Sequence, residues 1–155
     1  MKKMTKILMM LVLLFSVCAC NEESIDEKIA KASEHCKYAN REDETLEALK
    51  ICNKLYDKSF KKMSLEQKCD LAVLYYDIFS ELKNDEVHYK EAGYKFMEVF
   101  NETMKNKQAA RNYYERKYGE YYYADDVFGM FYNAYTMLDM AKNGMVDFED
   151  LDFGF

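Results

Sequence analysis

Apolar side chains recur at spacings of three and four along most of this chain, which is the period of an α-helix with one buried face. Ile25, Ile29, Ala32 and Cys36 show the pattern near its first polar stretch. Residues that interrupt helices are rare, because the chain contains no proline and only five glycines. The pattern therefore predicts an all-α fold.

The periodic segments divide into about six helices. Capping boxes that begin at Ser24 and Ser64 predict the starts of the first and third helices. Gly119 and the pair Asn143-Gly144 predict the ends of the fifth and sixth. Two apolar stripes on the third helix indicate burial on both of its sides. The predicted helices span about 24–38, 42–57, 64–82, 85–105, 107–118 and 123–142.

Small residues recur at long range in the even-numbered helices. Ala48, Ala92 and Ala134 lie in the second, fourth and sixth predicted helices, 44 and 42 residues apart. A small side chain lets two helices approach closely, so this spacing indicates three stacked helical hairpins. Such an arrangement is similar to tetratricopeptide-like arrays, in which helix pairs stack into a superhelix with a concave binding face. A compact six-helix bundle explains the same stripes equally well.

The first nineteen residues have the pattern of a signal peptide. Lysines precede an uncharged run from Ile7 to Ala19, which is shorter than the roughly 20 residues that a membrane-spanning helix needs. The residues Val17-Cys18-Ala19-Cys20 that close this run resemble the lipobox of bacterial lipoproteins. The resemblance implies that the thiol of Cys20 carries a diacylglyceryl group and that the signal is cleaved just before it.

The lipobox resemblance also implies a location and a domain plan. Each methylene of an acyl chain that is buried in a bilayer contributes about 0.8 kcal/mol of binding free energy, so two or three chains attach a protein durably to a bacterial membrane. We expect a signal peptide at 1–19, a lipid-anchored tether at 20–23, a helical domain at 24–143 and an acidic C-terminal tail at 144–155. The cell envelope is the predicted location, with the inner membrane, the outer membrane and the cell surface left open.

The charge of the chain excludes one class of partner, and the positions of its cysteines indicate their role. The chain has a net charge of −6, and removal of residues 1–19 takes away three lysines, which leaves 19 basic and 28 acidic side chains and a net charge of −9. An anionic domain repels phosphate backbones, so nucleic acid is not a predicted partner. Cys36, Cys52 and Cys69 fall on apolar stripes and are interpreted as small core residues, although export permits one disulfide among them.

A tyrosine-rich segment is the predicted contact surface. Ten of the 23 residues from Tyr113 to Tyr135 are aromatic. Consecutive tyrosines cannot all face inward on a helix, where neighbours lie about 100° apart, so some must be exposed. Exposed tyrosine is a good contact residue for a protein or a glycan, although any single ring more often packs a core. The candidate partner-binding residues are Tyr114, Tyr118, Tyr121 and Tyr122.

The chain also contains a segment near its C-terminal end that resembles an EF-hand calcium loop. The resemblance places four side chains on ligand positions, with Gly144 at the sharp turn; these are Asp139, Asn143, Asp147 and Asp150. Ala141 replaces one ligand oxygen, and Asp150 is shorter than the usual bidentate glutamate. We favour the simpler interpretation, a glycine-capped helix followed by an acidic tail, and expect no other cofactor.

Linear motifs of catalysis are not found in this sequence, and the two histidines lie on different predicted helices. We therefore predict a non-enzymatic, membrane-anchored envelope lipoprotein whose helical domain is an interaction module for a protein partner. The alternatives are a calcium-binding module that uses the loop at 139–150 and a glycan-binding module that uses residues 113–135.

Overall fold

The computed structural model describes residues 23–37, 41–122, 125–148 and 151, and these are helical almost throughout, without a β-strand. The all-α prediction is thereby confirmed. Cys20 and Asp150, which the sequence singled out, lie outside the described residues. The elements in chain order are α2 (Ile25–Cys36), α3 (Glu42–Ser59), η1 (Phe60–Lys62), α4 (Leu65–Glu81), α5 (Glu86–Thr103), η2 (Met104–Asn106), α6 (Lys107–Tyr122) and α7 (Val127–Lys142).

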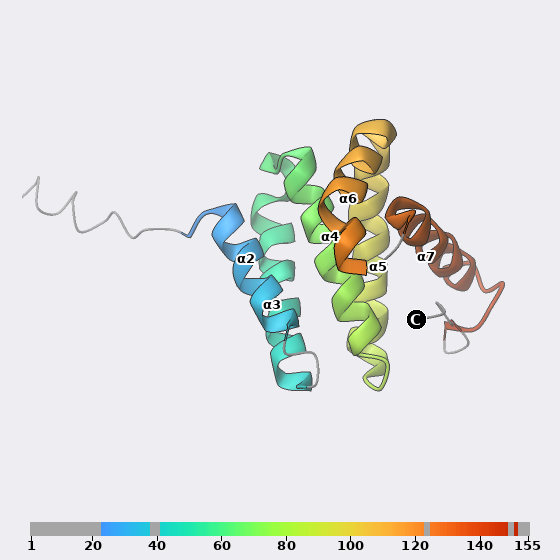
Figure 1. The fold of residues 1–155 in the computed structure, drawn as a ribbon. Coiled ribbons are helices and arrows are strands. Elements are labelled where there is room, and N and C mark those ends of the chain that lie inside the picture. Colours follow the sequence, from blue (N-terminus) through green and yellow to red (C-terminus); the bar gives the residue numbers. More distant parts are fainter. Residues whose placement is uncertain (1–22, 38–40, 123–124, 149–150, 152–155) are drawn as a thin grey trace, which may run out of the picture.

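Consecutive helices pair with one another. In Figure 1, α2 and α3 lie side by side at one end of the molecule, α4 and α5 fill the middle, and α7 lies at the other end. The helix α6 lies against α4 and also contacts α7. This arrangement is compatible with stacked hairpins and with a helical bundle. The three alanines expected at close helix contacts are all buried, as predicted for Ala48, Ala92 and Ala134.

Both predicted capping boxes are present. The hydroxyl of Ser24 accepts a hydrogen bond from the backbone N–H of Glu27, and the hydroxyl of Ser64 accepts one from that of Gln67. At the other end, Gly144 has a φ of +69°, a left-handed conformation that suits glycine and ends α7. The start and stop signals at these three places therefore act as the sequence indicated.

The central helix is α4, and it is buried on both sides as its two stripes predicted. Ten of its side chains are buried, among them Tyr75, Ile78 and Phe79. A second part of the core joins α5, α6 and α7 through aromatic rings. The ring of Phe131 lies 5.2 Å from that of Tyr114 and 6.4 Å from that of Phe100, measured between centroids. These contacts position α6 against the rest of the molecule.

The prediction that α6 ends near Gly119 is wrong. The helix continues to Tyr122, and α7 begins at Val127 with Asp126 as its N-cap. Gly119 has no heavy atom within 4 Å of the position that a Cβ would occupy, so neither packing nor backbone conformation requires a glycine there. The additional turn of α6 is held by hydrogen bonds from its tyrosines to α4, which outweigh the weak helix propensity of glycine.

The predicted acidic tail contributes side chains to the core. Phe148 is 9% exposed, and its ring stands edge-on to Tyr89 at a centroid distance of 5.2 Å. Leu151 is also buried. Asp147, which precedes these two residues, is exposed. The described part of this segment is therefore amphipathic and not wholly solvated.

Candidate functional site

A groove of about 430 Å³ lies between α2, α4 and α6. Each helix supplies one wall: Ile29 and Ala30 come from α2, Val73 and Leu74 from α4, and Tyr121 from the last turn of α6. Two carboxylates of the groove, Asp70 and Asp77, come from α4, where they lie seven residues apart and therefore on one face of the helix. About half of the lining is apolar or aromatic, and its charged residues are these two acids, Asp26 of α2, and two lysines, Lys37 and Lys117.

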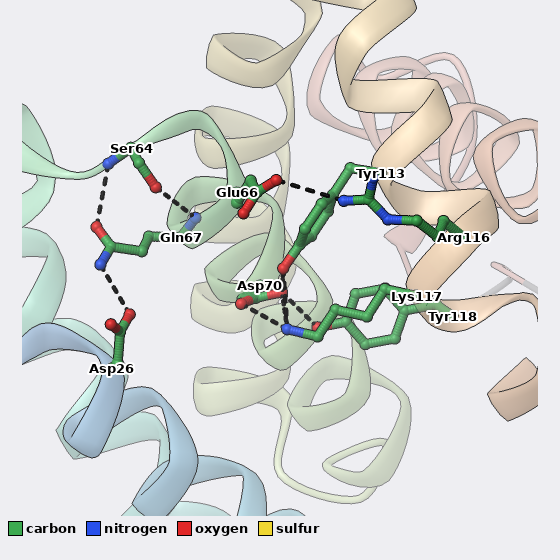
Figure 2. A network of polar contacts seen from close by, with 9 residues as sticks. All are labelled: Asp26, Ser64, Glu66, Gln67, Asp70, Tyr113, Arg116, Lys117 and Tyr118. Carbon is green, nitrogen blue, oxygen red and sulfur yellow. Dashed lines mark hydrogen bonds and ion pairs between the residues drawn. The ribbon is translucent and has the colours of Figure 1, made fainter.

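The first carboxylate, Asp70, is buried and fully compensated (Figure 2). Lys117 donates to its two oxygens at 2.7 and 2.8 Å, and the hydroxyls of Tyr113 and Tyr118 donate to Oδ1 at 2.8 and 2.7 Å. All three donors come from successive turns of α6. A buried carboxylate needs such partners to offset the loss of its hydration. This cluster therefore attaches α6 to α4 and is mainly structural.

Polar contacts also join the first turn of α4 to α2 and α6. Gln67, which completes the capping box of α4, donates from its side-chain amide to Asp26 of α2 at 2.7 Å. On the other side, Arg116 of α6 approaches Glu66 of α4 to 3.4 Å (Figure 2). The first turn of α4 is thus linked to both neighbouring helices. These contacts connect the three helices that form the walls of the groove.

The second carboxylate, Asp77, has much less support. Its Oδ1 accepts a hydrogen bond of 2.5 Å from the hydroxyl of Tyr122, and no lysine, arginine or histidine of the described residues pairs with it. Burial raises the pKa of Asp77 to about 7, the hydrogen bond from Tyr122 opposes that rise, and the nearby carboxylate of Glu81 adds to it. Asp77 is therefore a weakly compensated carboxylate at one end of the groove.

The predicted contact tyrosines occupy three different environments. Tyr114 is fully buried in the aromatic core, so it has no surface with which to contact a partner in this conformation. Tyr118 and Tyr122 are partly buried and donate their hydroxyls to Asp70 and Asp77. Tyr121 alone of the four is exposed, at 58%, and it lines the groove. The tyrosine-rich segment thus builds the groove more than it forms a flat surface.

The carboxylates of the groove were not singled out from the sequence, although a signal exists. Asp70 and Asp77 are the only charged residues between Cys69 and Ser80, a stretch that is otherwise apolar or aromatic. Charged side chains are seldom buried unless they are paired, so acids on a helix that is buried on both sides mark a polar site. Their tyrosine partners lie 43 to 48 residues later in the chain, and local patterns do not show such pairings.

Three of the four candidate calcium ligands, Asp139, Asn143 and Asp147, lie within the described residues. Within the described ranges, no group of three or more His, Cys, Asp or Glu side chains is placed to hold a metal ion. Asp139 is exposed on α7, Asp147 is exposed beyond it, and the side-chain amide of Asn143 donates to the backbone oxygen of Asp139 at 2.8 Å. This contact satisfies a carbonyl at the end of the helix, as in an ordinary C-cap.

The cysteines of the helical domain are free thiols. Cys52 and Cys69 are buried, in agreement with their prediction as core residues, whereas Cys36 is half-buried and lines the groove. Burial raises the pKa of the Cys36 thiol to about 12, with smaller contributions from Asp77 and Glu81, so this thiol is protonated near neutral pH. It contributes an apolar surface to the groove and not a nucleophile.

None of the helices formed by the described residues is both long enough and apolar enough to cross a lipid bilayer. No protein-family model matches the chain, and neither a curated protein nor a solved structure matches it. The interpretation of the groove therefore depends on its own residues.

Proposed function

We propose that this protein is a non-enzymatic lipoprotein of the bacterial cell envelope, anchored by lipid on Cys20, whose helical domain holds a protein partner in the groove between α2, α4 and α6. The observation that carries the proposal is the groove itself, with the exposed ring of Tyr121 and four aliphatic side chains on its walls. Accessible aromatic side chains beside apolar surface are typical of protein contact sites.

The position of the groove fits a protein held near a membrane. Ser24, the N-cap of α2, follows Cys20 by four positions, and a chain of that length spans at most about 14 Å. Since α2 forms one wall of the groove, a lipid on Cys20 would keep the groove close to the bilayer. The net negative charge of the chain disfavours insertion among anionic headgroups, which leaves an envelope protein as the expected occupant.

Photocrosslinking of the full chain in its native envelope tests the function. Benzoylphenylalanine in place of Tyr121 should capture a discrete envelope protein, and an excess of unmodified full chain should compete the product away. The matched control places the same group at Val87 of α5, which is 74% exposed and lies outside the groove. The same products from both positions, or none from position 121, would contradict a partner-binding groove.

The anchor is tested separately. A Cys20→Ser variant should accumulate as an uncleaved precursor without a lipid label, and it should leave the membrane fraction after carbonate washing. A Cys18→Ser variant is the matched control, because Cys18 occupies a lipobox position that tolerates serine. A mature mass that is unchanged by Cys20→Ser would refute the assignment of the lipid.

A further inference from the structure

The two carboxylates that α4 contributes to the groove differ in their compensation, and the difference points to a ligand. Asp70 receives a lysine and two tyrosine hydroxyls, so its charge is satisfied within the chain. Asp77 receives only the hydroxyl of Tyr122 among the described residues. Its neighbour Glu81, four residues later on α4, adds a second negative charge on the same face. A cation at this end of the groove would compensate the charge of Asp77 and reduce its repulsion with Glu81.

We propose that Asp77 forms the bottom of a subsite that receives a basic side chain, arginine or lysine, from the partner protein. The inference rests on the proposed function and names the chemistry by which the groove recognises its partner. A guanidinium or ammonium group would donate to the Oδ2 of Asp77, while Oδ1 keeps its bond to Tyr122. The pairing would take place in a half-enclosed site, where a charge-assisted hydrogen bond is stronger than in open water.

Aromatic and aliphatic side chains around Asp77 suit the rest of such a ligand. The face of the exposed Tyr121 ring is available to a cation. This ring is held edge-on to the ring of Tyr122 at a centroid distance of 4.8 Å. Val73 and Leu74 lie one turn before Asp77 on α4, and Ile29 lies on the facing wall. Arginine and lysine carry an apolar stem that packs on surfaces of this kind while the charged group stays at the carboxylate.

The shape of the groove favours a segment of polypeptide as the source of this side chain. Asp70 and Asp77 are separated by seven residues of helix, or about 10 Å along the axis of α4. An extended chain advances about 3.3 Å per residue, so the groove accommodates roughly three residues. One of these would place its basic side chain at Asp77, and its neighbours would contact the aliphatic walls.

Other charged groups near Asp77 leave this subsite acidic. On α6, Lys117 is engaged by Asp70, and the pKa values of Tyr118, Tyr121 and Tyr122 are raised, so these side chains stay neutral. On α2, Cys36 is a protonated thiol. Lys37, which follows α2, is exposed, and within the described residues it forms no ion pair with Asp70 or Asp77. A basic ligand therefore meets a site that the chain itself has not neutralised.

Blocked tripeptides test the subsite directly by calorimetry on the full chain in a neutral maltoside detergent. The probe acetyl-Leu-Arg-Leu-amide should bind at least about tenfold more tightly than the same peptide with citrulline, which keeps the shape of arginine without its charge. In the Asp77→Asn variant the arginine peptide should fall to the affinity of the citrulline peptide. Tyr121→Ala should weaken the arginine peptide by about threefold through loss of the cation–π contact.

Asp139→Asn is the matched control, because it removes an exposed carboxylate outside the groove and should leave the affinity unchanged. The arginine peptide should also bind more tightly at about pH 8 than at about pH 6, since Asp77 must lose its proton to form the ion pair. Circular dichroism melting of each variant verifies that it folds. Equal affinity for the arginine and citrulline peptides, or an arginine affinity that Asp77→Asn does not change, would overturn the proposal.

The crosslinking experiment distinguishes this inference from the proposed function. A partner captured at position 121 through a segment without arginine or lysine, equally in wild type and Asp77→Asn, would leave the function standing and refute the cationic subsite. A charge-dependent peptide affinity without any captured envelope protein would support the cationic subsite and refute the proposed function. Capture through a basic segment, with a crosslinking yield that Asp77→Asn lowers by about tenfold, supports both proposals.

Discussion

Replacement of Asp77 by asparagine should make the folded protein more stable at neutral pH. Burial raises the pKa of this carboxyl from 3.8 to about 7 in the folded state. Below about pH 4 the carboxyl is protonated in the folded and the unfolded chain. As the pH rises from 4 to 7, the unfolded chain releases this proton while the folded chain retains it, so the free energy of unfolding falls.

The magnitude follows from the size of the pKa difference. One pKa unit corresponds to about 1.4 kcal/mol, so a difference of about three units sets a ceiling of about 4 kcal/mol on the loss of stability between pH 4 and pH 7. Asp77 lines an open groove, and water there screens part of this effect. We expect Asp77→Asn to be about 2 kcal/mol more stable than wild type at about pH 8.

Urea unfolding followed by circular dichroism at several pH values measures this difference. The two proteins should converge towards about pH 4, where the wild-type carboxyl is protonated and resembles the neutral amide. Asparagine keeps an acceptor for the hydroxyl of Tyr122, so the hydrogen bond to α6 is preserved. Asp139→Asn, which removes an exposed acid on α7, should show no such pH-dependent gain. A variant less stable than wild type at pH 8 would refute the account of Asp77 as an uncompensated charge.

Three other predictions concern the helix ends and the proposed metal loop. The carboxylate of Glu115 accepts hydrogen bonds from two backbone N–H groups at the start of α7. Glu115→Ala should therefore lower the free energy of unfolding by about 2 kcal/mol in urea titrations, and Glu115→Gln should lower it by about half as much. Gly144→Ala should cost about 1 kcal/mol through its left-handed φ, whereas Gly119→Ala within α6 should raise the melting temperature; equal effects would contradict the difference in backbone conformation. Millimolar calcium should leave the melting temperatures of wild type and Asp139→Ala alike, and a rise seen only in wild type would favour the metal loop.

The all-α fold class and most helix positions were predictable from the sequence because they depend on local patterns. The capping boxes at Ser24 and Ser64 combine propensity with a hydrogen bond three residues away, and both helices begin where those boxes indicate. Gly144 likewise ends α7 through its own backbone conformation. At Gly119 the same local rule failed, because hydrogen bonds from the tyrosines at 118 and 122 to α4 keep the helix intact beyond the glycine.

The groove was harder to predict, because its chemistry depends on which helices meet. The spacing of Asp70 and Asp77 places both acids on one face of α4, but it does not reveal that Lys117 compensates only the first. That asymmetry arises from the way α6 lies against α4. Two tyrosines of α6 and Lys117 reach Asp70, whereas the last turn of α6 brings only Tyr122 to Asp77. The unequal outcome identifies Asp77 as the residue at which an external cation has the most to gain.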